Sequence, residues 1–534
     1  MRRNWGWLFL FAIAGTTLKP DNTDAQVIAK KQVRIEQNKA WLYKSNVVTL
    51  NGKHWSIAPQ AEIKEGGEQI SSDDYVPKEW MKATVPGTVF GAYVEAGKEQ
   101  EPTYGDNAYR VDQTKYDRNF WYRTTFVTPA NYNDGITWLN IDGINRDADI
   151  YLNGKKLGSL HGFMQRGRFD ISALTKVGAQ NSLAILDYVP LLQTKMIEKD
   201  NSRENSTSPA FICSKGWDWM PRVPGLNMGI YKDVYLSHTD AVSIIDPWIR
   251  SDLPNLPDTN TATLSVQTDL INNADRAITG ALTGEIIPGN IKFTYPVTLN
   301  AKETRTIKFD AKTVAALKII KPKLWWPNGY GTPNLYTCKL SFRLGNSVSD
   351  KKDIRFGIRK FTYTTVDSIL RVHINGVPLF LKGGNWGMAE FMLRCTEKEF
   401  ETRLKLHREM NYNIIRDWMG MIPDRAFYDA CDKYGMMIWN DFWLNSSGGN
   451  PDSLELFRAN AIENIKQIRN HPAIALWCGE NERAPLEPIN SWLREDIATY
   501  DGGDRYYQPN SHAENLSGSG PWNNLDPNSI SREQ

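Results

Sequence analysis

The strongest constraint on the fold is a change of sequence pattern close to Arg355. Before it, short apolar runs alternate with turn residues; after it, apolar strands alternate with helical segments. The first pattern is typical of all-β domains, and the second is typical of parallel strand–helix units. The chain is therefore predicted to be a multidomain protein of the β plus α/β class. Its length of 534 residues suffices for about three or four domains.

The all-β part divides into two predicted modules. Residues 26–240 contain runs such as Trp121–Phe126 and the hairpin signal Asn153–Gly154, which together predict an N-terminal jelly-roll β-sandwich. Residues 241–350 contain runs such as Leu335–Phe342, and the spacing of these runs predicts an immunoglobulin-like β-sandwich.

Residues 351–534 are predicted to form the first part of an incomplete (β/α)8 TIM barrel. The expected strands are Leu379–Lys382, Ile414–Trp418, Met436–Phe442 and Ile474–Cys478, and the expected helices are Thr396–Met410, Asp424–Tyr434 and Ser453–Arg469. Thr396 and Glu399 have the spacing of a capping box. In such a barrel the C-terminal ends of the strands meet on one face, and that face carries the active site.

Composition argues against several classes of partner. The chain has 63 Lys and Arg against 61 Asp and Glu, a net charge of +2, with no sizeable block of one sign. No nucleic-acid or anionic-membrane partner is therefore expected. The five cysteines are scattered, so they predict neither a disulfide framework nor a metal site. Because the sequence also lacks a phosphate loop and a dinucleotide fingerprint, no cofactor and no metal are expected.

The N-terminal segment has the pattern of a secretory signal. A basic start at Met1–Arg3 is followed by an apolar run, and Thr23–Ala25 offers a cleavage site. The run is about nine residues long, whereas a membrane-spanning helix needs about 20. Residues 1–25 are therefore predicted to be a signal peptide, and the protein is expected to be exported to the periplasm or the cell exterior. An uncleaved anchor or a misassigned start is the alternative.

The segment Ile474–Glu482 contains the clearest functional signal. It reads as a short buried strand that ends in an amide, Asn481, and a carboxylate, Glu482. Reactive polar side chains directly after a buried strand predict an active site at the end of that strand. A surface carboxylate in an acidic loop is the plainer interpretation of Glu482.

This segment resembles the acid/base motif of family 2 glycoside hydrolases. Its form from Leu476 to Glu482 is most similar to the β-mannosidase and endo-β-mannosidase branch, and the order of the two preceding β modules, the first of them sugar-binding-like, matches the family. The supporting segments are Gly216–Trp219 with Pro221 and Arg222, Phe380–Trp386, Ile415–Trp418 and Arg469–Pro472. The resemblance implies a retaining hydrolase of β-linked sugars that acts on an oligosaccharide or glycan.

The resemblance assigns the chemistry to two adjacent residues, Asn481 and Glu482. Glu482 is expected to be the acid/base that gives a proton to the departing oxygen, and Asn481 is expected to hydrogen-bond the 2-hydroxyl of the sugar.

Four further residues are expected to bind substrate or shape the pocket. By resemblance, Arg416 orients the nucleophile, Trp386 and Trp418 wall the pocket, and Asp218 reaches from the first domain to the hydroxyls of the terminal sugar. The residues alone leave other interpretations open: a structural ion pair for Arg416, core packing for the tryptophans and a turn cap for Asp218.

The nucleophile is expected to be absent from this chain. In a whole barrel it would lie on the seventh strand, about 90 residues beyond Glu482, and the sequence ends at Gln534. We therefore expect a C-terminally truncated chain that is inactive alone and folds poorly after residue 360 or so.

Two alternatives to a β-mannosidase-like enzyme remain. One is an exo-β-glucosaminidase or β-galactosidase relative on the same scaffold, because the pair Asn481–Glu482 does not separate these sugars, although Asp218 favours mannose. The other is of a different class: a non-catalytic carbohydrate-binding remnant built from the two β modules.

Overall fold

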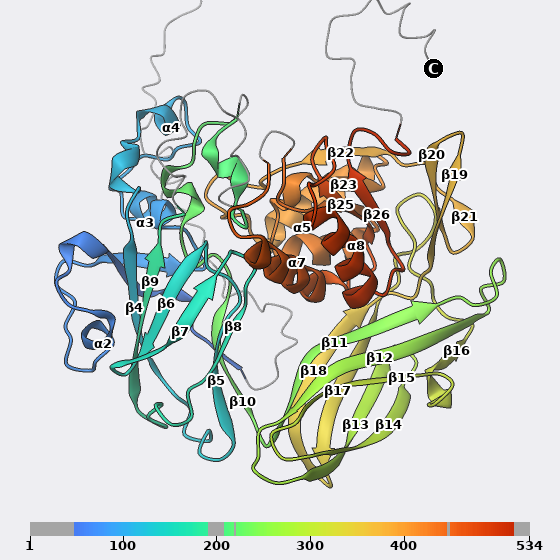
Figure 1. Ribbon diagram of the computed structural model, residues 1–534, viewed down its shortest axis with the longest axis horizontal. Coiled ribbons are helices and arrows are strands. Elements are labelled where there is room, and N and C mark those ends of the chain that lie inside the picture. The colour runs from blue at the N-terminus through green and yellow to red at the C-terminus, as the bar shows by residue number, and fades with distance from the viewer. Residues whose placement is uncertain (1–46, 191–207, 218–219, 446–448, 517–534) are drawn as a thin grey trace, which may run out of the picture. The chain divides into compact units, whose positions relative to one another are not determined.

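The computed structural model of the protein describes residues 47–190, 208–217, 220–445 and 449–516 (Figure 1). All of these residues belong to one compact unit. Their elements form two β-sandwiches, a small antiparallel sheet and a parallel sheet with helices. The predicted signal peptide at 1–25 and the candidate Asp218 lie outside the described residues.

The first sandwich is made of a four-stranded sheet in the order β1-β10-β5-β8 and a six-stranded sheet in the order β3-β2-β4-β9-β6-β7. Its strands are β1 (Val47–Thr49), β2 (Gly52–Pro59), β3 (Met81–Val85), β4 (Phe120–Val127), β5 (Ile136–Ile141), β6 (Asp147–Leu152), β7 (Lys155–His161), β8 (Gly167–Asp170), β9 (Gln180–Tyr188) and β10 (Val234–Thr239). Buried side chains of both sheets, among them Trp55, Leu139 and Ile185, form one core.

The predicted hairpin signal of this sandwich is confirmed. Asn153 and Gly154 connect β6 to β7 with φ angles of 47° and 81°. Two positive φ angles in succession suit the twist of a tight hairpin, which is why this pair favours it. The helices of this part are short: α2 (Gly67–Ile70), α3 (Val89–Glu95) and α4 (Asn107–Arg110), with the 3-10 turns η1 (Gln60–Glu62), η2 (Gln113–Lys115), η5 (Ile212–Lys215) and η6 (Pro224–Asn227).

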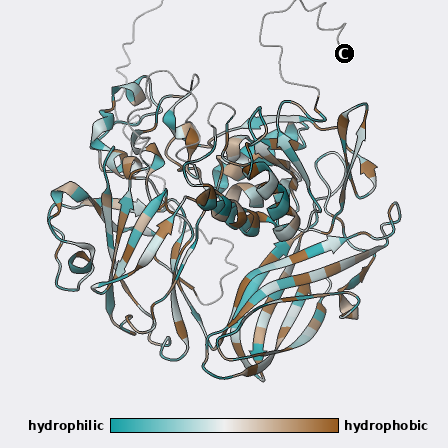
Figure 2. Ribbon diagram, viewed as in Figure 1, coloured by the Kyte–Doolittle hydropathy of each residue, from teal (hydrophilic) through white to brown (hydrophobic). Residues whose placement is uncertain are grey.

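The second sandwich is immunoglobulin-like. Its sheets have the orders β11-β12-β15, with β16 also paired to β12, and β14-β13-β17-β18. The strands are β11 (Val242–Asp252), β12 (Thr261–Asn272), β13 (Ile278–Ile287), β14 (Ile291–Leu299), β15 (Thr304–Asp310), β16 (Lys318–Ile320), β17 (Tyr336–Leu344) and β18 (Ser347–Phe356), with η7 (Ala315–Leu317) between them. Every second residue of β12 is buried, and the alternation of apolar and polar residues can be followed along these strands in Figure 2. That alternation makes one face of each sheet a core face.

After the second sandwich comes a small sheet of three antiparallel strands, β19 (Phe361–Val366), β20 (Ile369–Ile374) and β21 (Val377–Pro378). A five-stranded parallel sheet follows, in the sequential order β22-β23-β24-β25-β26. Its strands are β22 (Gly383–Trp386), β23 (Ile414–Asp417), β24 (Met437–Asp441), β25 (Ile474–Glu480) and β26 (Tyr506–Asn510). The helices between them are α5 (Glu397–Glu409), α6 (Arg425–Tyr434), α7 (Leu454–Ile468) and α8 (Ile489–Tyr500), and η8 (Trp418–Gly420) follows β23.

The helix boundaries of this part follow from local signals. The side chain of Thr396 caps α5 and Glu399 completes the predicted capping box. Gly435 ends α6 in the left-handed conformation, with φ of 70°, which costs glycine little. Ser453 caps α7 through its hydroxyl, which accepts from the backbone N–H of Leu456.

The first parallel strand differs from the prediction. We expected Leu379–Lys382, whereas β22 is Gly383–Trp386. A Cβ on Gly383 would lie 1.8 Å from the carbonyl oxygen of Ile414. Only glycine therefore permits this approach of β22 to β23, and the more apolar Phe380 is left 74% exposed.

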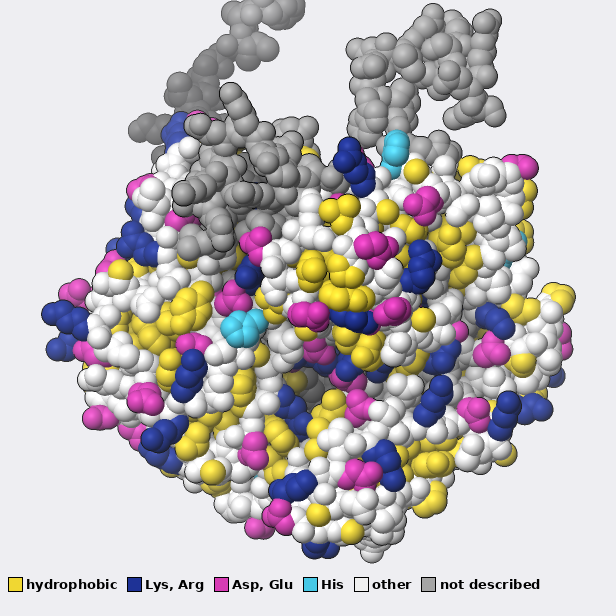
Figure 3. Space-filling view, in the orientation of Figure 1, with side chains coloured by type: hydrophobic (Ala, Val, Ile, Leu, Met, Phe, Trp, Pro, Cys, Tyr) yellow, Lys and Arg dark blue, Asp and Glu magenta, His cyan; other side chains and the backbone are white. Residues whose placement is uncertain are grey.

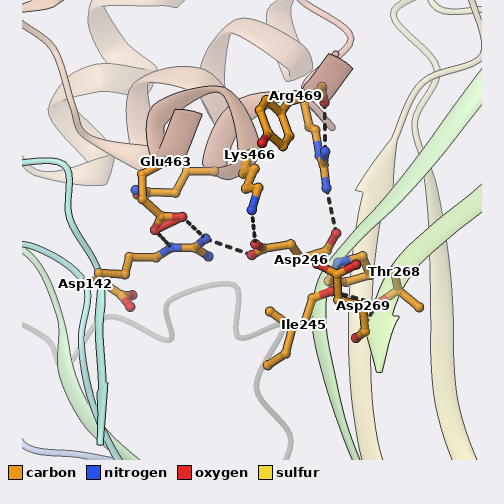
Figure 4. Close-up of polar contacts among 12 residues, drawn as sticks. Asp142, Ile245, Asp246, Thr268, Asp269, Glu463, Lys466 and Arg469 are labelled. Atoms are coloured by element: carbon orange, nitrogen blue, oxygen red, sulfur yellow. Dashed lines mark hydrogen bonds and ion pairs between the residues drawn. The ribbon is translucent and has the colours of Figure 1, made fainter. Parts of the chain in front are cut away.

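A buried cluster of charges joins the two sandwiches to α7 (Figure 4). Arg166, from the segment between β7 and β8, donates to both carboxylate oxygens of Glu463 on α7, at 2.9 and 2.6 Å. It also donates to Asp246 on β11 at 2.7 Å. Lys466 lies 3.7 Å from the same Asp246 carboxylate, and Arg469 donates to the Asp246 carbonyl at 2.8 Å. Helix α7 is thus held by side chains of both sandwiches.

Three further features concern the surface charges, the cysteines and the helix lengths. On the face drawn in Figure 3, positive and negative side chains are interspersed. All five cysteines are free, and four of them are buried. Within the described ranges, no helix has the length and apolar character needed to cross a membrane.

Candidate active site

Strand β25 brings Asn481 and Glu482 to the C-terminal edge of the parallel sheet. All seven residues of β25 are buried, as expected for a central strand covered on both faces. A Cβ on Gly479 would lie 2.6 Å from the carbonyl oxygen of Pro509, so this position requires glycine. Asn481 forms a bridge with Asn445 after β24, which extends the pairing by one step beyond β25.

Glu482 is exposed at this edge and has an unusual backbone. Its φ of 72° lies in the left-handed region, which is rare for residues other than glycine. Its backbone N–H donates to the hydroxyl oxygen of Ser511, after β26, at 2.9 Å. Strained backbone at such a position is often associated with function. The effect here is to turn the chain sharply after Asn481.

The side chain of Asn481 is 7% exposed and held by three groups. Its oxygen accepts from Arg416 at 3.0 Å and from the indole N–H of Trp418 at 3.1 Å. Its amide nitrogen donates to the side-chain oxygen of Asn445 at 2.9 Å. Because Arg and Trp side chains only donate, these contacts determine which way the amide points.

Asp441 is the partner of Arg416 in this network. Arg416 Nε lies 3.1 and 2.9 Å from the two carboxylate oxygens, and Nη2 lies 2.5 Å from one of them. The Asp441 side chain has no exposed surface. Burial alone lowers the pKa of the Arg416 guanidinium, but Asp441 outweighs burial and raises it. The sequence offered one weak signal for Asp441, its place at the end of β24.

A second buried carboxylate, Asp417, lies on the helix side of the sheet. It accepts from the backbone N–H of Ile422 at 3.1 Å and from the hydroxyl of Tyr428 at 3.4 Å. Burial, and then the nearby charge of Asp441, raise the pKa of the Asp417 carboxyl well above its usual value. Asp417 therefore belongs to the packing between β23 and α6.

Trp418 connects this network to the first sandwich. Its ring lies 5.2 Å from that of Trp217, at 90°, an edge-to-face contact. Trp217 forms an antiparallel bridge with Met220. The residue next to Asp218 is thus in contact with a member of the network, while Asp218 itself lies outside the described part of the chain.

Trp386 lies on the other face of the sheet from the one we expected. Its ring stacks on His407 of α5 at 5.6 Å and meets Phe427 of α6 edge-on at 5.6 Å. In the parallel register, Asn385 is the residue beside Arg416, and adjacent residues of neighbouring strands point to the same face. Alternation along β22 therefore puts Asn385, and not the predicted Trp386, on the same side of the sheet as Arg416.

One cluster near β25 has side chains that can ligate metals. The ligand atoms of Asp429, Asp432 and His471 lie within 4.8 Å of one another. Arg355 makes an ion pair with Asp429, while Asp432 is hydrogen-bonded to His471 at 2.6 Å and accepts from the Ala473 N–H at 3.1 Å. These contacts hold the turn that leads into β25, and Arg355 also lies 4.0 Å from the Asp432 carboxylate, so the cluster already contains a cation.

Two family models match the chain. The model described as glycosyl hydrolase 2 galactose-binding domain-like matches residues 55–232, the first sandwich, and the model described as glycosyl hydrolases family 2 matches residues 242–359, the second sandwich. The chain belongs to glycosyl hydrolase family 2. Its predicted membership is thereby confirmed, and the network around Asn481 and Glu482 lies in the part that follows the two matched modules.

Individual relatives of this family 2 chain extend the match beyond the sandwiches. The mannosylglycoprotein endo-β-mannosidase of Lilium longiflorum is 30% identical over 474 residues, which is 83% of this chain and 49% of that protein. The exo-β-D-glucosaminidase of Streptomyces avermitilis is 27% identical over 500 residues, 89% of this chain and 52% of that protein. The solved structure of the β-D-mannosidase from Dictyoglomus thermophilum has a TM-score of 0.73 at 26% identity and covers 88% of this chain and 58% of its own. The chain spans about half the length of the curated relatives it matches.

Proposed function

We propose that this chain carries the acid/base side of a retaining β-glycosidase active site of the β-mannosidase type. The observation that carries the proposal is the network in which Arg416 and Trp418 orient Asn481 immediately before an exposed Glu482. Glu482 gives a proton to the departing glycosidic oxygen. The second amide N–H of Asn481 faces the 2-hydroxyl of the sugar, and this hydrogen bond strengthens as positive charge develops in the transition state.

Retaining hydrolysis needs a second carboxylate about 5 to 5.5 Å from the first to attack the anomeric carbon. Two buried carboxylates at this edge, Asp441 and Asp417, are engaged by Arg416 and by Tyr428. We therefore place the nucleophile on a strand beyond β26, in a (β/α)8 barrel of which β22–β26 form the first five strands.

Mannose is the sugar that the proposal favours. The contact of Trp217 with Trp418 supports a position for Asp218 beside the pocket, where its carboxylate would accept hydrogen bonds from the terminal sugar. The similarity to an exo-β-D-glucosaminidase supports the alternative, a glucosaminidase on the same scaffold. We further propose export of the protein, on the basis of the predicted signal peptide at residues 1–25.

Equilibrium binding tests the proposal without requiring the nucleophile. The purified chain is titrated with methyl β-mannoside, methyl β-glucosaminide and methyl β-galactoside in a calorimeter. Preferred binding of the mannoside, weakened about tenfold by Asn481→Ala, is expected, since a hydrogen bond to a sugar hydroxyl contributes about 1.5 kcal/mol. Binding that is unchanged by Asn481→Ala and survives removal of residues after 350 would instead support the carbohydrate-binding remnant.

An activity assay completes the test. Turnover of an aryl β-mannoside by the chain, abolished by Glu482→Gln, would show that the nucleophile lies within these residues and would overturn its placement beyond β26. Tighter binding of methyl β-glucosaminide than of methyl β-mannoside in the titration would move the assignment to the alternative.

A further inference from the structure

Two tyrosines of the first sandwich are exposed to an unusual degree. Tyr104 and Tyr109 are 78% and 76% exposed, more than any other large apolar or aromatic side chain in the described ranges. Both lie in the segment between α3 and β4, on either side of the start of α4. Single exposed aromatic residues are common on protein surfaces, so their position decides whether they have a role.

One side of this segment is fixed to the loop that follows β22. Arg394, in that loop, donates to both carboxylate oxygens of Glu101, at 2.9 and 3.0 Å, and also donates to Glu390 at 3.0 Å. The hydrogen bonds with Arg394 lower the pKa of Glu101 to about 2, so the pair stays charged at neutral pH. Asn107, the first residue of α4, donates to the Glu101 carbonyl at 3.0 Å. Asn107 lies between the two tyrosines in the sequence. The segment that carries the tyrosines is therefore fixed, through Glu101 and Arg394, to the loop at the C-terminal end of β22.

The loop after β22 is itself firmly held. Met392 has no exposed surface and packs in the core of the first sandwich. The ring of Phe391 lies 6.5 Å from that of Phe90, and its carbonyl accepts from the side chain of Asn227 at 3.0 Å. The position of Arg394, and with it that of Glu101, is thus set by core packing as well as by charge.

The other side of the tyrosine segment is fixed to the segment that contains Trp217. Arg222 donates to Gln113 and to Asp117, each at 2.6 Å. The backbone of Arg222 lies against the residue before Trp217, since a Cβ on Gly216 would lie 2.9 Å from the Arg222 backbone nitrogen. Trp217 contacts Trp418, which bonds Asn481. Residues 101–117 are therefore held at one end by the loop that follows β22 and at the other by the segment of Trp217, which contacts the candidate site through Trp418.

We propose that Tyr104 and Tyr109 form an outer saccharide subsite, which binds sugar rings that follow the one held at Glu482. The inference rests on the proposed function and extends it, because it assigns a β-linked oligosaccharide of two or more units as the preferred ligand. The apolar C–H faces of pyranose rings stack on aromatic rings, and the tyrosine hydroxyls add hydrogen bonds to sugar hydroxyls. The exposed pair Asp106 and Arg110, between and beside the tyrosines, supplies further polar contacts.

The test compares β-1,4-linked mannotriose with methyl β-mannoside by calorimetry on the full chain. Tighter binding of mannotriose is expected for the unmutated chain. The variants Tyr104→Ala and Tyr109→Ala should each lose about three- to tenfold in mannotriose affinity and leave methyl β-mannoside affinity unchanged. Tyr104→Phe keeps the ring and should retain most of the affinity. Phe380→Ala removes an equally exposed aromatic residue, 74% exposed, that precedes β22 at the opposite end of the strand, and is expected to change neither affinity.

The outcomes separate this inference from the proposed function. Mannotriose that binds no tighter than methyl β-mannoside, or equal mannotriose binding by both alanine variants and the unmutated chain, would overturn the subsite and leave the proposed function standing. Failure of the unmutated chain to bind either ligand would overturn both. Circular dichroism melting curves of the alanine variants, which change only exposed side chains, are expected to match that of the unmutated chain.

Discussion

The indole N–H of Trp418 donates to the side-chain oxygen of Asn481 at 3.1 Å, so the residue that follows β23 holds the residue that follows β25. Both side chains are at the edge where the candidate acid/base, Glu482, is exposed. The bond couples the direction of the amide to the contact between the two tryptophans of the site, Trp217 and Trp418.

Removing this donor should weaken sugar binding without unfolding the protein. Trp418→Phe keeps an aromatic ring against Trp217 but leaves the Asn481 oxygen with Arg416 alone. We expect methyl β-mannoside affinity to fall several-fold, with a loss of about 1 kcal/mol in the free energy of unfolding. Calorimetry and urea unfolding measure the two effects. Trp492→Phe on α8 is the control and should leave affinity unchanged, and equal affinities for all three proteins would contradict the role of the bond.

Breaking the buried pair of Arg416 and Asp441 should be costly, and removing both charges should cost less. Asp441→Leu leaves the Arg416 cation, whose side chain is 13% exposed, without its partner. A loss of about 3 to 5 kcal/mol in unfolding free energy is expected. The double variant Arg416→Met with Asp441→Leu should be more stable than Asp441→Leu alone. If the double variant loses as much unfolding free energy as Arg416→Met and Asp441→Leu lose separately when added together, the two residues are not coupled.

The charge cluster at α7 should determine how tightly the sandwiches are joined to the parallel sheet. Arg166→Met leaves Glu463 and Asp246, both largely buried, without their shared partner. We expect a loss of about 3 kcal/mol and cleavage by low concentrations of protease between the parts, followed on gels. Arg110→Met, which removes an exposed ion pair with Asp106, is the matched control and should change stability by less than about 0.5 kcal/mol. Equal protease resistance of the two variants would count against the cluster.

Asp187 should make the protein less stable as pH rises. Its side chain has no exposed surface, its two carboxylate oxygens have no hydrogen-bond partner, and burial raises its pKa well above the usual value. A folded-state pKa above the unfolded one contributes stability that is full below about pH 4 and is lost as pH rises toward the folded pKa, by up to about 1.4 kcal/mol per pH unit. The side chain of the Asp187→Asn variant cannot ionise. Urea unfolding should therefore show that the stability of the variant, relative to that of the unmutated protein, increases between pH 5 and pH 8. A constant difference across this range would refute the raised pKa.

The sequence predicts those parts of the fold whose signals are local. The capping box of Thr396 and the hairpin pair Asn153–Gly154 each act within a few residues, and both predictions are confirmed. The predicted end of a helix at Tyr434 is confirmed as well, where Gly435 supplies the local signal. The position of β22 was missed because it depends on a contact between Gly383 and Ile414, which are far apart in the chain. A contact of that kind has no trace in the local pattern of apolar residues.

The residues of the candidate site also differ in whether a local sequence signal predicts them. Asn481 and Glu482 stand out because their polar side chains end a strongly apolar strand. Asp441 as the partner of Arg416 emerges only when β23 and β24 lie side by side. The face of Trp386 follows from strand alternation only once the bounds of β22 are known, and the same alternation makes Asn385 the residue beside Arg416.

Helix α7 has a consequence for engineering. It presents one side to Arg166 and Asp246 and is followed directly by the turn into β25. A chimera that combines the sandwiches of one relative with the parallel sheet of another would therefore meet a mismatch at the helix surface even if each module folded well. Recombination points for such chimeras should keep α7 together with residues 161–166 and 246–249 from a single parent, since these segments form one unit of exchange.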